Sequence, residues 1–274
     1  MSVTAAPVRR AAFRPPIDLE EVVVDPAAAP IVRLEPTAKR VRAFVGGIAV
    51  ADSTNVQLML EGGRLPVYYF PLQDVRMDLL APGARTSTSP TKGDATYFDI
   101  DAGEQFVPNA AWRYPGSPQG CPDLSGLVAF HWRLMDAWYE EDEEVLAHAR
   151  DPYKRIDVLL STRHVRLTAG DTLLGDSRNV RMLFETGMPV RYYLRREDVR
   201  FDELVDSDIV TACAYKGITS RYWSQRDGAL HVAWSYERPK PEVGAIAGLV
   251  CFFNERVDIT VDGVPQERPK TPFS

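Results

Sequence analysis

The chain has 274 residues, of which 45% are hydrophobic and 26% are charged, a composition typical of a globular protein. Its length fits two domains of ordinary size. The net charge of -6 argues against nucleic acid as a partner, because nucleic-acid binding usually needs lysines and arginines clustered on one face.

Three cysteines occur, and none stands in a Cys-x-x-Cys pair or at ligand spacing from a histidine, which argues against a zinc site or a disulfide framework. Residues 1–16 lack the apolar core of a signal peptide. No later stretch approaches the roughly 18 apolar residues that a membrane span requires. The sequence therefore predicts a soluble, cytoplasmic protein without a membrane partner, metal or cofactor.

The chain begins with an N-terminal arm, expected over residues 1–39. Its prolines are too frequent for regular secondary structure, although the run from Glu20 to Val24 would suit an edge strand of a sheet. A first β-domain is expected to follow over residues 40–138.

Short runs rich in β-branched and aromatic residues succeed one another through this first domain, with glycine and proline between them. The runs are Val41 to Val45, Ile48 to Ala51, Val67 to Phe70, Tyr97 to Ile100, Ala110 to Tyr114 and Leu127 to Trp132. Gly46 and Gly47 separate the first two runs and predict a hairpin turn. The pattern predicts a mainly β fold, a compact antiparallel domain with little helix.

An acidic linker is expected over residues 139–157. Within it, residues 140–150 read EEDEEVLAHAR, a run of good helix formers with acids first and a basic residue last, as the helix dipole favours. We therefore predict a short connecting helix. A solvated, charged segment without a binding role explains the same composition equally well.

The second domain, expected over residues 158–274, repeats the first. Eight residues recur at one constant offset within a window of 21 positions, where composition alone gives about one or two identities. The eight pairs are Val41 with Val165, Arg42 with Arg166, Gly46 with Gly170, Asp52 with Asp176, Ser53 with Ser177, Asn55 with Asn179, Val56 with Val180 and Glu61 with Glu185.

The match continues almost to the end of each copy. It includes Asp74-Val75-Arg76 with Asp198-Val199-Arg200, Lys92-Gly93 with Lys216-Gly217, and Ala111-Trp112 with Ala233-Trp234. Two copies are too few for a solenoid. We therefore expect an internal duplication whose copies pack as an intrachain pseudo-dimer, and a monomeric protein.

The first copy contains the ordered elements V-x-G-x-x-x-A-D-S, from Val45 to Ser53, and a glutamate nine residues after Asp52. Elements of the kinds P-V-x-Y-Y, D-V-R, K-G, A-W-x-Y and G-L-V-x-F then follow in both copies. This co-linear set resembles domain-of-unknown-function family 427, over about residues 41–136 and 165–263. The resemblance implies a compact β-domain of the β-tent kind in each copy.

That family also carries a nucleotidyltransferase-like label. Polymerase-type transferases hold Mg²⁺ with paired acids on a strand beside a Gly-Ser turn, and phosphate cradles use glycine-rich loops ahead of a helix. The sequence contains neither pattern, so the residues give the label no support, and nucleotide transfer stays a further alternative.

The family's lysine motif usually reads Cys-x-x-Lys-Gly, and the chain keeps it once, from Cys213 to Gly217. In the first copy Ser89 replaces the cysteine. This replacement argues against a thiol-dependent role for the motif of the first copy. Lys216 is a candidate cation for a carboxylate or phosphate, or a nucleophile or base if burial lowers its pKa. The following glycine would let a ligand approach the backbone. A plain salt bridge at a strand end accounts for the lysine equally well.

Two acids recur in the copies, Asp176 as Asp52 and Glu185 as Glu61. Such acids suit general acid or base chemistry when burial raises the pKa. For Asp176 we favour the alternative of a turn, which an Asp-Ser pair often forms. Glu185 ends a mostly apolar run and is a candidate buried partner of Lys216.

The remaining candidates are a thiol and several aromatic rings. Cys213 lies near a lysine that would favour its thiolate, although a buried, inert cysteine is the commoner case. Trp234 and Tyr236 are expected on one face of a strand, whereas Tyr192 and Tyr193 should point to opposite faces. Aromatic side chains are more often part of a core than of a ligand platform.

Our leading hypothesis is a protein that handles a small molecule. A more specific form of this hypothesis is an enzyme, with Lys216, Glu185 and Cys213 as its catalytic candidates. The ligand-binding candidates are Tyr193, Tyr215, Trp234, Tyr236, Asp176, Lys92 and Glu61. The alternative is a non-catalytic binding or scaffold module whose shared residues only hold strands together. An open pocket with Lys216 facing Glu185 would favour the first, and a filled interior the second.

Overall fold

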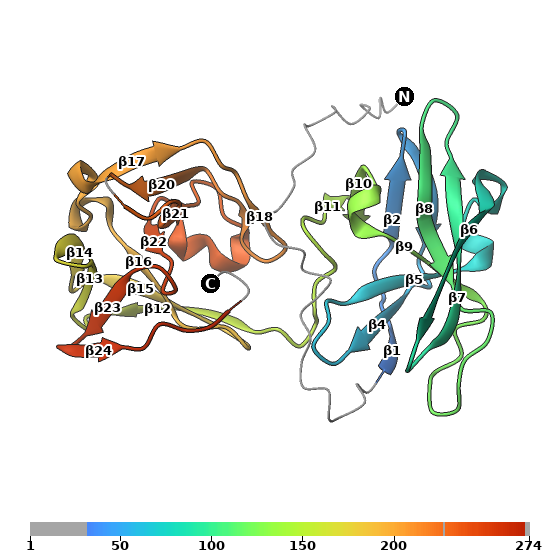
Figure 1. The fold of residues 1–274 in the computed structure, drawn as a ribbon, viewed down its shortest axis with the longest axis horizontal. Coiled ribbons are helices and arrows are strands. Elements are labelled where there is room, and N and C mark those ends of the chain that lie inside the picture. Colours follow the sequence, from blue (N-terminus) through green and yellow to red (C-terminus); the bar gives the residue numbers. More distant parts are fainter. Residues whose placement is uncertain (1–31, 227, 272–274) are drawn as a thin grey trace. The chain divides into compact units, whose positions relative to one another are not determined.

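The computed structural model describes residues 32–226 and 228–271. The chain divides into two compact units between residues 151 and 152. We call residues 32–151 the first repeat and residues 152–271 the second repeat (Figure 1). Both are built of antiparallel strands, as the sequence predicts, and the proposed strand over Glu20 to Val24 lies outside the described residues.

The first repeat contains a seven-stranded and a four-stranded sheet. The large sheet has the order β1 (Val32–Pro36), β4 (Gln57–Glu61), β5 (Val67–Pro71), β9 (Leu127–Phe130), β8 (Phe106–Arg113), β7 (Gly93–Asp101) and β6 (Leu80–Ser89). The small sheet has the order β11 (Glu143–Glu144), β10 (Ala137–Glu140), β2 (Val41–Val45) and β3 (Ile48–Ser53).

The second repeat has the same plan. Its large sheet has the order β12 (Ile156–Ser161), β15 (Val180–Glu185), β16 (Arg191–Leu194), β22 (Val250–Phe252), β21 (Ala233–Ser235), β20 (Arg221–Gln225) and β17 (Leu204–Ser207). Its small sheet has the order β14 (Thr172–Ser177), β13 (Val165–Ala169), β23 (Asp258–Val261) and β24 (Val264–Gln266). A separate hairpin joins β18 (Ala212–Cys213) to β19 (Gly217–Ile218).

The helices of the described residues are short 3-10 turns. They are η2 (Leu72–Asp74), η3 (Met77–Leu79), η4 (Trp132–Leu134), η5 (Arg196–Asp198), η6 (Phe201–Glu203) and η7 (Pro241–Ile246). The expectation of little helix is therefore confirmed.

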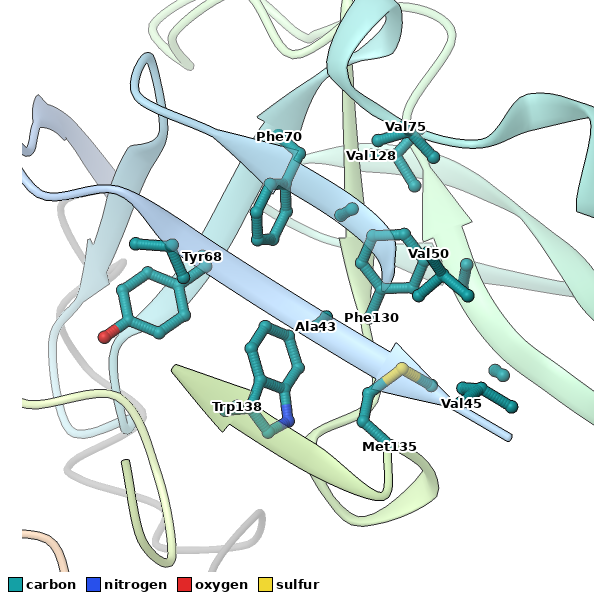
Figure 2. Close-up of a cluster of buried hydrophobic side chains, with 14 of the residues drawn as sticks. Ala43, Val45, Val50, Tyr68, Phe70, Val75, Val128, Phe130, Met135 and Trp138 are labelled. Carbon is teal, nitrogen blue, oxygen red and sulfur yellow. The ribbon is translucent and has the colours of Figure 1, made fainter. Parts of the chain in front are cut away.

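A core lies between the two sheets of the first repeat. Because side chains alternate along a strand, even-numbered residues of β4, β5 and β9 point into this core, including Tyr68, Phe70 and Phe130. Figure 2 shows these rings beside Trp138 of β10 and Val45 of β2, which come from the small sheet. Burial of these apolar surfaces is the main force that holds one sheet on the other.

Each large sheet carries a second buried cluster on its opposite face. In the first repeat the odd-numbered Met59 and Tyr69 belong to it, together with Leu124 from the loop between β8 and β9. In the second repeat it contains Tyr193 and, from the equivalent loop, Ile246. We call these the outer clusters, and both candidate lysines lie beside them.

The predicted connecting helix over residues 140–150 is wrong. Strands β10 and β11 form a hairpin there, with Glu140 paired to Glu143 and a turn at Glu141. Strand β10 also pairs with β2 and buries Trp138. This tertiary pairing outweighs the helix propensity of the acidic run, which is worth only tenths of a kcal/mol per residue.

The end of the N-terminal arm is also more regular than the proline count indicates. Strand β1 pairs with β4 at the edge of the large sheet, and Pro36 is its last residue. Proline is tolerated at an edge, where its missing N–H faces no partner strand. The first repeat therefore includes residues 32–36, although the sequence predicts that they belong to the arm.

Candidate functional site

The lysine motif forms a three-residue hairpin loop in both repeats. Cys213 pairs with Gly217 across β18 and β19, and Ser89 pairs with Gly93 across β6 and β7. Gly217 and Gly93 have φ values of +103° and +83°, in the region that glycine adopts without strain. Three-residue hairpins commonly end in such a residue, so the Lys-Gly pair has a local structural reason.

The space beside each of these glycines is filled by the protein itself. A side chain at Gly217 would meet the backbone of Arg238, with its oxygen 3.6 Å from the added carbon. At Gly93 the nearest atom belongs to Pro118, at 3.3 Å. In the direction that a side chain would take, each glycine therefore faces a neighbouring loop of the same repeat, and the approach of a ligand to the backbone there stays a prediction.

Glu185 and Lys216 form a buried ion pair. Glu185 is the last residue of β15 and lies opposite Ile156 of the edge strand β12. The Lys216 ammonium group donates to its Oε2 atom, and 9% of the Glu185 side chain and 11% of the Lys216 side chain are exposed. The predicted pairing of this acid with this lysine is thus present.

A second cation contacts the same carboxylate. Lys154 Nζ lies 3.1 Å from Glu185 Oε1, and its side chain is more exposed than that of Lys216. The Lys154 ammonium group also lies 5.6 Å from the centre of the Tyr215 ring, a cation–π distance. One carboxylate therefore stands between two ammonium groups, which leaves one surplus positive charge.

The first repeat also contains a glutamate between an inner lysine and an outer cation, but its outer cation is a different residue. Lys92 Nζ donates to Glu61 Oε2 at 2.6 Å, and Thr91 donates to Oε1 at 3.1 Å. The outer cation is Arg64, whose Nε atom lies 3.5 Å from Glu61 Oε2. Met188 stands at the position of Arg64 in the second repeat, so the two outer cations come from different places in the repeat.

The electrostatics of the pair define Lys216 as a cation. Burial alone would lower the pKa of Lys216, but Cys213 and Glu185 raise it above its ordinary value. Burial alone would raise the pKa of Glu185, but Lys216 and Lys154 lower it below its ordinary value. The resting site therefore holds Lys216 as an ammonium group, and its nitrogen can act as a base or nucleophile only after the ammonium group has given up a proton.

Each repeat places a thiol near its lysine. In the second, Cys213 is half-buried and its Sγ atom lies 3.9 Å from Lys216 Nζ. In the first, Cys121 packs on the outer cluster, and its backbone N–H donates to Pro118, which lies against Gly93. Burial raises the pKa of the Cys121 thiol, and Lys92 acts to lower it.

The first repeat therefore also has a thiol within electrostatic range of its lysine, although its lysine motif contains no cysteine. The loop between β8 and β9 brings Cys121 close to the position that the motif leaves without one. In the second repeat Val243 occupies the equivalent place in the loop. No signal in the lysine motif itself could have revealed this.

Several of the predicted aromatic residues lie in buried clusters of the second repeat. Tyr193, Trp234 and Tyr236 belong to the outer cluster, whereas Tyr192 belongs to the core between the sheets, which confirms the predicted faces. Burial raises the pKa of Tyr193 and Tyr236, with a smaller effect of Cys213 in the same direction. All three rings are buried in the outer cluster of the second repeat.

Asp176 does not join the site. Its carboxylate is exposed on the small sheet and lies 2.7 Å from His164 Nε2. The adjoining Ser177 donates to Asp198 at 2.7 Å and accepts from the backbone of Asn179. Ser177 thus forms the turn contact and links this motif to the D-V-R element, whereas the Asp176 side chain faces His164 and does not cap the turn.

The second repeat contains a second buried ion pair, which none of the sequence motifs predicts. Both guanidinium Nη atoms of Arg191 donate to Glu255 at 2.7 Å, with 7% and 0% of the two side chains exposed. The guanidinium carbon lies 5.8 Å from the centre of the Trp234 ring. Val67 and Arg133 occupy the corresponding positions of the first repeat, so comparison of the copies could not reveal this pair.

Features of two other classes of protein are absent from the described residues. Among residues 32–226 and 228–271, no group of three or more His, Cys, Asp or Glu side chains is placed to hold a metal ion. Within the same residues, no helix has the length and apolar character needed to cross a membrane.

Comparison with known proteins identifies the family of the chain. No curated protein matches it at a significant level. The family NTP_transf_9, described as a domain of unknown function (DUF427), matches residues 33–141 and again residues 157–263. These two matches coincide closely with the two repeats and together cover most of the sequence, so the chain belongs to the DUF427 family and carries two copies of its domain in tandem.

Proposed function

We propose that the second repeat binds a small anionic molecule, with a carboxylate or phosphate group, beside Lys216 and Lys154. The observation that carries this proposal is the position of Glu185 between two ammonium groups. One carboxylate neutralises one of the two cations, and the remaining charge favours an anion where burial weakens solvation by water.

Lys154 is the group that an incoming anion would meet first. About a quarter of its side chain is exposed, 24%, against 11% for Lys216. The half-buried Tyr215 and Cys213 lie at the same site, so an anion would find a hydrogen-bond donor or an aromatic ring beside the cation. Lys216 would then position Glu185 and supply the inner charge.

The first repeat supports the same interpretation. Glu61 also lies between an inner and an outer cation, Lys92 and Arg64, although the outer residue occupies another position. Each repeat thus places one glutamate between two cations, although the outer cation comes from a different position. This agreement is expected if both repeats need a cation-rich site. We therefore expect both repeats to bind anions.

Thermal-shift screening of the full chain against inorganic phosphate and small carboxylates tests the proposal. We expect concentration-dependent stabilisation by at least one anion, reduced at least tenfold in apparent affinity by Lys154→Met and abolished by Lys216→Ala. Arg268→Met is a matched control, because Arg268 pairs with Asp258 on the small sheet. Equal stabilisation of the wild type and a folded Lys154→Met variant would contradict the proposal.

A scaffold role is the second candidate, favoured by one specific observation. Lys216 and Glu185 are buried and already satisfy each other, as a purely structural pair would. Under this alternative, no anion would bind, and substitution of Lys216 would change only stability. A nucleotidyltransferase role predicts Mg²⁺-dependent binding of ATP, and calorimetry that shows no heat with ATP and Mg²⁺ would remove it.

A further inference from the structure

The hairpin between β18 and β19 brings a thiol and an amine together. Lys216 Nζ lies 3.9 Å from Cys213 Sγ, at the two ends of a three-residue loop. The pairing of Cys213 with Gly217 holds this loop closed. A covalent link between the two side chains would therefore cost little additional chain entropy.

The surroundings of the two groups suit an oxidative reaction. Cys213 is half-buried and Cys251 is fully buried, so Cys213 is the more open of these two cysteines to a small oxidant. The Glu185 carboxylate accepts a hydrogen bond from the Lys216 ammonium group and can take a proton from it. Sulfenic acids formed on cysteine condense with a thiol or with a backbone nitrogen, in the second case through a sulfur–nitrogen bond. The Lys216 amine is a nitrogen nucleophile placed close to the Cys213 sulfur atom.

We propose that peroxide oxidation joins Cys213 to Lys216 through a covalent bond between Sγ and Nζ. In the first step the thiol sulfur attacks hydrogen peroxide, the O–O bond breaks, and a sulfenic acid and one water form. Sulfur supplies the two electrons that reduce the peroxide.

The second step is a substitution without further oxidation. Lys216 loses one proton to Glu185, and its nitrogen attacks the sulfur atom of the sulfenic acid. The S–O bond breaks, and the departing hydroxide takes a second proton from the nitrogen to leave as water. The link that remains contains one hydrogen on nitrogen, and Glu185 returns its proton to solvent.

The link would change the charge of the site. Lys216 would no longer be an ammonium group, so Glu185 would keep Lys154 as its one cation and the surplus positive charge would disappear. Oxidation would then weaken the anion binding proposed above. This consequence rests on the proposed function, whereas the link itself does not.

The first repeat provides an internal comparison. Ser89 stands at the position of Cys213, and its hydroxyl accepts from the backbone N–H of Lys92 at 3.2 Å. A hydroxyl cannot form a sulfenic acid, so the hairpin of the first repeat cannot form the same link. The change Ser89→Cys would supply the missing thiol three residues before Lys92.

Mass spectrometry of the full chain treated with hydrogen peroxide tests the proposal. We expect the tryptic peptide that contains Cys213 to lose two hydrogens, to resist cleavage after Lys216, and to recover both properties with dithiothreitol. Cys213→Ser should abolish all three changes, and Ser89→Cys should produce them at Lys92. Because the readout is a mass, failure of anion binding would leave it unchanged.

Two results would overturn the proposal. One is conversion of Cys213 to a sulfinic acid while trypsin still cleaves after Lys216. The other is an unmodified Cys213 under conditions that oxidise Cys121, which is also half-buried.

Discussion

Lys216 contacts Glu185 across 31 residues of chain, and Lys92 contacts Glu61 across the same separation. In both repeats a glutamate at the end of one strand meets a lysine in a hairpin loop, beside an aromatic cluster on the outer face of the large sheet. The inner pair is the same in both copies, while the outer cation and the thiol come from different positions.

Removal of Lys216 should destabilise the second repeat. Lys216→Met leaves the buried Glu185 with Lys154 as its partner, and we expect the free energy of unfolding to fall by about 3 kcal/mol. Lys154→Met should cost about 1 kcal/mol or less, because Lys154 is more exposed. Urea denaturation measures both values. The double change Glu185→Leu with Lys216→Met should recover most of the loss, and no recovery would contradict this account.

Stability should depend on the ionisation of the same pair. Because the pKa of Glu185 is lowered in the folded protein, its contribution is complete above the unfolded-state value of about 4.3 and is lost as the pH falls through the lower folded value. The raised pKa of Lys216 gives a contribution that is complete below about 10.4 and is lost above it.

Denaturation of the wild type and of Glu185→Gln across this pH range measures the effect. The difference in unfolding free energy should be large near neutral pH and should shrink in acid as Glu185 becomes protonated. A difference that stays constant into strong acid would show that Glu185 does not act through its charge.

The pair of Arg191 and Glu255 should also be essential to the second repeat. Arg191→Met leaves a fully buried carboxylate with Thr271 as a remaining donor, and we expect a loss of about 3 kcal/mol in unfolding free energy. Arg191→Lys should cost less but remain destabilising, because an ammonium group cannot donate two parallel bonds. A fully stable Arg191→Met variant would refute this role.

The three cysteines should react in a fixed order. Burial raises the pKa of Cys251 to about 12, so its thiolate is scarce and its sulfur is covered. Cys213 and Cys121 are half-buried and should be alkylated by iodoacetamide in the folded protein, whereas Cys251 should react only in urea. Peptide mapping gives the three rates, and rapid alkylation of Cys251 in the folded chain would contradict its burial.

Much of the fold follows directly from the sequence. The constant offset between the copies predicts the two repeats, and alternation along the strands places Tyr192 and Tyr193 on opposite faces of their sheet, as found. Hairpin geometry at Gly46 and Gly47 is likewise confirmed by their positive φ values. These features depend on the spacing and type of residues that are close in the sequence, so they can be predicted from it.

The failures share a physical cause. Residues 140–144 form a strand hairpin because β2 supplies a partner, and β1 forms because β4 supplies another. Lys154 and Cys121 reach their sites through tertiary packing from segments outside the recurring motifs. Such contacts between distant segments leave no local signal, and comparison of two copies reveals only what both copies keep at the same position.

The most direct test of the anion site is an NMR titration of the full chain with inorganic phosphate. We expect saturable shifts of the amide signals of Cys213, Tyr215 and Gly217, and their loss in a folded Lys154→Met variant. Saturable binding that leaves these signals unmoved, or that persists unchanged in Lys154→Met, would contradict the central claim that Glu185 and its two lysines form an anion-binding site.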